Sequence, residues 1–227
     1  LRSRDISAYE RKELMQWVAR AGREGNRVIA VAQKAFAPGR KYTLYEEQDL
    51  EFSGLIAFRD ELKPTARETI DRAKRLGVTV KIITGDSQEV SGAVGHAVGL
   101  IASPDMVVTG KMLDAMTESE RRIAIWDGVV FARVSPHQKF EIIKVLEEKY
   151  EVGFLGEGIN DAPALKLANV AIVVESASDI AREAADVVLL EKSLSTVIDG
   201  IREGRTIFAN ILKYLRVTLT SNFGNFY

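Results

Sequence analysis

Short runs of apolar residues alternate along most of this chain with segments of helical periodicity. The apolar runs cover residues 52–58, 78–83, 129–132, 152–155, 170–174 and 187–190. Helical patterns fit residues 63–76, 88–98, 117–125, 136–149, 162–168 and 178–185. Short β-branched runs separated by helices are typical of a parallel sheet that is buried on both faces. The pattern therefore predicts an α/β domain with a mainly parallel sheet flanked by helices.

The two ends of the chain follow other patterns. Residues 9–23 predict a helix, because apolar residues recur there at helical spacing, and residues 27–33 then predict a strand. Residues 37–49 are polar, contain a Pro-Gly pair and predict a loop or junction. From Thr196 onward apolar residues return at helical spacing, and the chain is still apolar at Tyr227. We expect here either a helix that continues beyond this sequence or an amphipathic helix packed on the domain.

Composition narrows the function classes. Among 227 residues, 31 Lys and Arg face 32 Asp and Glu, and this balance argues against a nucleic-acid binder. The chain has no cysteine and only two histidines, which excludes disulfide scaffolds, thiol nucleophiles and multi-histidine metal sites. No stretch reaches the ~18 consecutive apolar residues of a membrane span. With 46% hydrophobic residues, the composition is that of an ordinary soluble globular protein.

Polar residues follow four of the apolar runs, where an open α/β sheet binds its ligands. They are residues 59–61, 84–87, 133–139 and 156–163. Thr84, Gly85 and Lys139 offer the hydroxyl, backbone N–H and ammonium donors that a phosphoryl group needs. Glu157 and Asp161, in a loop with two glycines, offer hard oxygen ligands for magnesium.

Each of these residues also has a structural interpretation. Asp86 or Ser87 could cap the helix that begins near residue 88, and Asp161 could cap the next helix. Lys139 could be a solvated surface charge. Four strand ends carrying phosphate-type and magnesium-type residues together nevertheless favour the functional interpretation.

Three motifs resemble those of the P-type cation-transporting ATPases of the haloacid-dehalogenase superfamily. They are Thr84-Gly85-Asp86, residues 131–139 (FARVSPHQK) and residues 156–165 (GEGINDAPAL), in family order and at family spacing. Residues 177–192, 208–214 and 221–225 are most similar to the magnesium-importing branch of prokaryotes. The resemblance covers nearly the whole chain.

The resemblance implies three regions. Residues 1–49 would be the end of a nucleotide-binding domain, and residues 50–204 a phosphorylation domain of haloacid-dehalogenase-like Rossmannoid fold that lacks its first strand and nucleophile. Residues 205–227 would be a stalk helix that leads into a transmembrane segment. The chain would then be a cytoplasmic fragment of a larger membrane enzyme, which spans the cell membrane several times.

The family motifs also imply roles for the phosphate-binding residues. Thr84 and Gly85 would hold the phosphoryl oxygens, and Lys139 would neutralise an aspartyl phosphate. Asn160 and Asp161 would organise the magnesium shell and the phosphorylation site.

Three further residues match positions near the nucleotide. Asp86 would face the nucleotide and the incoming water or domain. Asp60 and Arg133 would lie near its ribose and phosphates.

The chain departs from the family at two points. The phosphorylated aspartate of an Asp-Lys-Thr-Gly-Thr motif is absent, so we expect the chain alone to be inactive. Glu157 stands where the family has an aspartate that binds magnesium. Its extra methylene moves the carboxylate by roughly 1.5 Å, and magnesium tolerates little geometric error. We therefore expect weaker or altered magnesium binding.

These features together predict part of an ATP-driven cation pump. The complete enzyme would bind ATP and Mg²⁺, form an aspartyl phosphate and move a cation across a membrane. The resemblance to the magnesium-importing branch implies that this cation is magnesium. One alternative is a soluble haloacid-dehalogenase-type phosphohydrolase, which would need its own nucleophilic aspartate after a strand. Another is a non-catalytic homologue of the phosphorylation domain, for which Glu157 is the hint.

Overall fold

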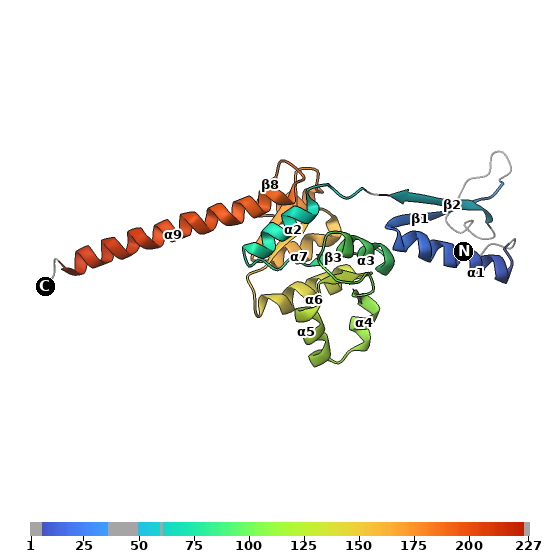
Figure 1. Cartoon of the computed structure of the whole chain (residues 1–227), viewed down its shortest axis with the longest axis horizontal. Helices are drawn as coiled ribbons and strands as arrows, with labels where there is room; N and C mark the ends of the chain where they lie inside the picture. The colour runs from blue at the N-terminus through green and yellow to red at the C-terminus, as the bar shows by residue number, and fades with distance from the viewer. Residues whose placement is uncertain (1–5, 36–49, 60, 225–227) are drawn as a thin grey trace. The chain divides into compact units, whose positions relative to one another are not determined.

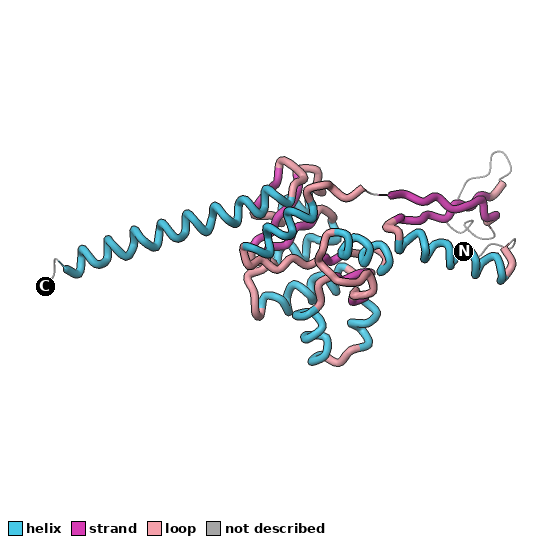
Figure 2. The backbone as a smooth tube through the Cα atoms, in the orientation of Figure 1, coloured by secondary structure: helices cyan, strands magenta, loops and turns pink. Residues whose placement is uncertain are grey.

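A computed structural model describes residues 6–35, 50–59 and 61–224 (Figure 1). The chain consists of two compact units. The first unit comprises Leu1–Lys63 and Lys81–Val134, and the second comprises Pro64–Val80 and Ser135–Tyr227. Figure 2 shows two long strands near the N-terminus, whereas the other strands are short.

The first unit begins with a helix and an antiparallel hairpin. Helix α1 (Ala8–Arg23) starts at a capping box in which the Ser7 hydroxyl accepts a hydrogen bond from the Glu10 backbone N–H. Strand β1 (Asn26–Gln33) then pairs antiparallel with β2 (Glu51–Arg59). The prediction that residues 52–58 belong to the parallel sheet is therefore wrong. Most of β2 is exposed, and its apolar residues gave no indication that its partner would be the preceding strand.

The rest of the first unit is a small α/β layer. Strands β3 (Ile82–Ile83), β5 (Val130–Ala132) and β4 (Val108–Thr109) form a parallel sheet in the order β3-β5-β4. Helices α3 (Gln88–Ala97), α4 (Gly110–Ala115) and α5 (Glu118–Asp127) connect them. The core cluster of this sheet consists of Ile101, Val107, Val130 and Ala132, with Ile82 and Val129 packed against it.

Strand β3 is shorter than the apolar run 78–83 predicts. Gly77 adopts a left-handed φ of 69°, and the Val78 N–H still donates to the Ala73 carbonyl at the end of the preceding helix. The first residues of the run are therefore used to terminate that helix, as in a Schellman-type C-cap.

Lys81 joins the start of β3 to the end of α5. Its ammonium donates to the carbonyl oxygens of Trp126, at 2.8 Å, and of Gly128. Such carbonyls at a helix C-terminus lack partners within the helix, and a cation there also interacts favourably with the helix dipole. Burial lowers the pKa of Lys81, and the nearby Asp127 carboxylate opposes part of that shift.

The second unit contains the other parallel sheet. Its strands β6 (Gly153–Gly156), β7 (Val170–Val174) and β8 (Val187–Leu189) are hydrogen-bonded in the order β6-β7-β8. Its helical elements are α2 (Ala66–Arg75), α6 (Pro136–Glu147), the 3₁₀ turn η2 (Ile159–Asp161), α7 (Ala162–Leu167), α8 (Asp179–Glu183) and α9 (Leu194–Gly224). Fully buried side chains on α6, α7 and β7 form its core, namely Ile142, Ile143, Leu165 and Val173.

The predicted α/β class with parallel sheets flanked by helices is confirmed, although the described residues form two three-stranded sheets instead of one. The predicted functional division at residues 49/50 and 204/205 stays a prediction. Among the described residues, no helix combines the length and the apolar character needed to cross a bilayer.

The packing of α3 leads to a stability prediction. A Cβ atom on Gly92 would lie 2.0 Å from the Pro104 carbonyl oxygen, whereas one on Gly200 in α9 would meet nothing within 4 Å. We expect Gly92→Ala to lower the free energy of unfolding by about 1–3 kcal/mol through overpacking. Gly200→Ala, the matched control, should leave it unchanged or raise it by up to ~1 kcal/mol. Urea unfolding followed by circular dichroism measures both, and a Gly92→Ala protein as stable as the wild type would contradict the packing.

Candidate functional site

The predicted site residues of the second unit form a polar group of side chains at the end of strand β6. Gly156 ends the strand, Glu157 and Gly158 form a short loop, and Asp161 closes the 3₁₀ turn before α7. Lys139 comes from the first turn of α6. Asp161 and Lys139 therefore reach the same place from two helix starts.

The start of α6 is fixed by its own sequence. Ser135 and Gln138 form a capping box, in which the Gln138 N–H donates to the Ser135 hydroxyl at 3.2 Å and the Ser135 N–H donates to Gln138 Oε1 at 2.9 Å. Pro136 occupies the first helical position, where its missing N–H costs nothing. This rigid first turn sets the direction from which Lys139 projects.

The Asp161 carboxylate is held by a cation and two backbone amides. Lys139 Nζ lies 2.7 Å from Asp161 Oδ1, and the two side chains are only 16% and 12% exposed. Asp161 Oδ2 accepts hydrogen bonds from the backbone N–H groups of Glu157, at 3.3 Å, and Gly158, at 3.2 Å. A charge-assisted pair in such a shielded place is far less screened than a surface ion pair.

This arrangement decides between the two interpretations of Asp161 and Lys139. Asp161 occupies the N-cap position of α7, but its side chain makes no cap hydrogen bond there. Lys139 is mostly covered, so it is not a solvated surface charge. Both residues instead belong to one polar group.

The glycine at position 156 lets the loop approach the carboxylate. A Cβ atom on Gly156 would lie 2.9 Å from Asp161 Cβ and 3.3 Å from its Oδ2. Protein interiors do not accommodate a Cβ atom as near to another carbon atom as 2.9 Å. A side chain at position 156 would therefore push the carboxylate away from Lys139.

The chemistry of the donors fits magnesium. Of about four acceptor positions on the Asp161 carboxylate, Lys139 and two amides engage three, and one remains on Oδ1. The Glu157 side chain is 69% exposed, and its Oε2 lies 3.6 Å from Lys192 Nζ. Magnesium usually takes one or two carboxylates and completes its shell with phosphate oxygens and water. In the part of the chain that the structure describes, no group of three or more His, Cys, Asp or Glu side chains could hold a metal ion by itself.

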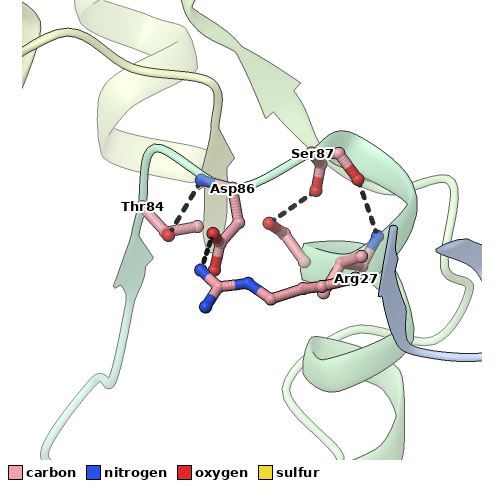
Figure 3. A network of polar contacts seen from close by, with 6 residues as sticks. Arg27, Thr84, Asp86 and Ser87 are labelled. Atoms are coloured by element: carbon pink, nitrogen blue, oxygen red, sulfur yellow. Dashed lines mark hydrogen bonds and ion pairs between the residues drawn. The ribbon is translucent and has the colours of Figure 1, made fainter. Parts of the chain in front are cut away.

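The first unit holds the other predicted group, in the loop after β3. The Thr84 hydroxyl accepts a hydrogen bond from the Asp86 N–H at 3.1 Å, which folds the loop back on itself (Figure 3). The backbone oxygens of Thr84 and Asp86 accept from the N–H groups of Val134, at 3.2 Å, and Arg133, at 2.9 Å. Arg133 adopts a φ of 50°, the one positive φ outside glycine among the described residues.

Arg27 joins this group, and the sequence analysis missed it. Its guanidinium forms an ion pair with the Asp86 carboxylate (Figure 3). Arg27 lies on β1, opposite Phe58 in the hairpin register. The signal in the sequence was weak: a single arginine at the start of an apolar strand, far from any motif.

Of the two residues that could cap the helix after this loop, Ser87 does so. Its hydroxyl accepts a hydrogen bond from the Val90 N–H at 3.4 Å, as an N-cap of α3 does (Figure 3). Asp86 does not cap the helix, and its carboxylate pairs with Arg27 instead.

The predicted site residues thus fall into two groups, one in each unit. Thr84, Gly85, Asp86 and Arg133 lie in the first unit, and Lys139, Glu157, Asn160 and Asp161 lie in the second. The prediction that they share the edge of one sheet is wrong in that β3 and β5 belong to one sheet and β6 to another. Asn160 is exposed, and Asp60 lies outside the described residues.

Comparison with known proteins identifies the family. A model of the haloacid dehalogenase-like hydrolases matches residues 5–169, which include the loop after β3, Lys139 and Asp161. This chain belongs to that hydrolase family. The superfamily implied by the motifs is therefore confirmed.

Curated relatives refine the family assignment. The chain is 47% identical over 206 residues to the magnesium-transporting ATPase, P-type 1, of Escherichia coli (strain K12), covering 89% of this chain and 23% of that protein. A protein of the same name from Salmonella typhimurium (strain LT2) is 45% identical and covered to 22%. Calcium-transporting ATPase 1 of Lactococcus lactis is 34% identical over 200 residues, covering 87% of this chain and 23% of its own length. The chain thus spans about a quarter of the length of these relatives.

The Lys139–Asp161 pair leads to a stability prediction. Lys139→Met leaves the shielded Asp161 carboxylate with only its two amide donors, so the free energy of unfolding should fall by about 1–3 kcal/mol. Lys144→Met, on the exposed side of the same helix, is the matched control and should change it by less than about 0.5 kcal/mol. Equal effects of the two substitutions in denaturant unfolding would show that the pair does not stabilise the unit.

Proposed function

We propose that this chain is the phosphate-handling part of an ATP-driven cation pump that works through an aspartyl phosphate. Similarity to proteins named magnesium- and calcium-transporting ATPases, over most of the chain, supports this proposal. The higher identity to the magnesium transporters favours magnesium as the transported cation. The pump would lie in the cell membrane, with this segment on its cytoplasmic side.

The Lys139–Asp161 pair is the observation that carries the proposal. Phosphoryl transfer is catalysed mainly by positioning and by stabilising negative charge, with little covalent chemistry from the protein. An ammonium group already oriented by a carboxylate and a capped helix turn can stabilise that charge without reorganising.

The residues would have the following roles in the reaction. An aspartate elsewhere in the complete protein attacks the γ-phosphorus of ATP, ADP leaves, and water later hydrolyses the acyl phosphate to regenerate the carboxylate and release phosphate. Lys139 stabilises the charge on the transferring phosphoryl group, and Asp161 holds Lys139 in place. Thr84 and Gly85 donate to phosphoryl oxygens through the hydroxyl and the backbone N–H.

The remaining residues would serve the metal and the nucleotide. Glu157 and Asp161, with Asn160 beside them, would hold Mg²⁺, which when bound neutralises and orients phosphate oxygens. Asp86 and Arg133 would lie at the nucleotide. By the family resemblance, Asp60 would do so as well.

The role of Lys139 can be tested in the complete protein. We expect Lys139→Ala to reduce phosphoenzyme formed from γ-labelled ATP by at least about 100-fold, because one preorganised charge is lost. Lys144→Ala, on the same helix but exposed, should phosphorylate normally.

Two results would count against the proposal. Phosphorylation of Lys139→Ala at the wild-type level would overturn the role of the lysine. A wild-type protein that never becomes phosphorylated, but releases phosphate from small phosphate esters, would be a soluble-type phosphohydrolase instead.

Glu157 is expected to set the magnesium requirement. Glu157→Asp shortens the side chain to the length that the metal geometry favours, so half-maximal phosphorylation should need less Mg²⁺. Glu183→Asp, the same change at an exposed position of α8, is the control. An unchanged Mg²⁺ dependence in Glu157→Asp would show that the longer side chain does not weaken the site.

A further inference from the structure

Among the residues that the structure describes, helix α9 is buried against the rest of the second unit in its first turns. Ile198 is 2% exposed, and α9 contacts α2, whose Ile70 and Ala73 are also buried. From residue 202 to residue 223 every position except Thr218 is exposed. The boundary between the attached and the exposed part of α9 therefore lies near Arg202.

Two polar contacts reinforce this attachment. Arg72 of α2 forms an ion pair with Asp199, and the Arg205 guanidinium donates to the Leu76 carbonyl oxygen. Arg72 and Leu76 are four residues apart, so they lie one above the other on the same face of α2. The two contacts therefore lie on either side of the boundary near Arg202, one at Asp199 in the attached part of α9 and one at Arg205 in its exposed part.

The charges of both helices favour the Arg72–Asp199 contact. The last turn of α2 carries Arg72, Lys74 and Arg75, so an acid facing it is stabilising. Asp199 supplies that acid and lies 3.6 Å from Arg202 of its own helix as well.

The end of α2 also needs a donor for its last carbonyl. Leu76 is the C-cap, and Gly77 then turns the chain with a φ of 69° toward β3. The Leu76 carbonyl therefore faces out of the helix, and Arg205 satisfies it with a positive charge at the negative end of the helix dipole.

We propose that Arg72, Asp199 and Arg205 are positioning residues that clamp α9 onto the end of α2, so that the two helices move as one body. A displacement of α2 then also moves the exposed part of α9, because the two helices cannot move independently. If the chain works in a pump, as proposed above, this clamp links α2, which precedes the Thr84 loop in the sequence, with α9.

Hydrogen exchange on this 227-residue chain tests the clamp directly. In Arg205→Gln, Asp199→Asn and Arg72→Gln, the α9 amides from residue 198 to residue 208 should exchange about 3- to 10-fold faster, because local opening becomes easier. Arg216→Gln and Glu203→Gln, at exposed positions of the same helix, should exchange like the wild type. The double variant Arg72→Gln/Asp199→Asn should be no faster than either single variant, since both remove one interaction.

Two outcomes overturn the clamp. Exchange unchanged in all three variants would show that apolar packing alone attaches α9. Additive effects in the Arg72/Asp199 pair would show that the two side chains act independently.

The complete protein tests the link to transport. Arg205→Gln should still form phosphoenzyme but move fewer ions per ATP than the Arg216→Gln control. An unchanged ratio, together with faster exchange, would overturn the coupling role. Absence of phosphoenzyme in the wild type would count against the proposed function and would leave the exchange result standing.

Discussion

A nearly buried carboxylate organises the second unit. Removing an ionised carboxylate from water is costly unless a counter-charge and hydrogen-bond donors replace the lost hydration. Asp161 obtains the counter-charge from Lys139 and the donors from the amides of Glu157 and Gly158. Several local features follow from that requirement: glycine at position 156, a tight turn before α7, and a capping box that starts α6 in the right direction.

Much of this group could be predicted from the sequence, because its parts are local. A strand end, two glycines and an acid within six residues define the loop. Ser135, Pro136 and Gln138 are typical of a helix start, and Ser135 lies four residues before Lys139. Periodicity likewise located α3, α6 and β7 closely. What it could not supply was the pairing of Lys139 with Asp161, since 22 residues separate them and only the fold brings them together.

The errors in the sequence analysis arose where pairing is not local. Residues 52–58 have the composition of a buried parallel strand, yet they pair with β1 in an antiparallel hairpin, and a run of apolar residues contains no information about its neighbour. The same hairpin carries Arg27 to Asp86, a contact between residues 59 apart in sequence. Residues 78–80 look like the start of a strand, but the left-handed Gly77 commits Val78 to the end of α2.

Arg133 shows a conflict between folding and side-chain choice. Its φ of 50° is a conformation that glycine or asparagine adopts at little cost and arginine does not. The strain persists because the N–H of Arg133 is tied to the Asp86 carbonyl in a loop fixed from both sides. Glycine would adopt this conformation with less strain, so the long cationic side chain at position 133 comes with a cost in backbone free energy.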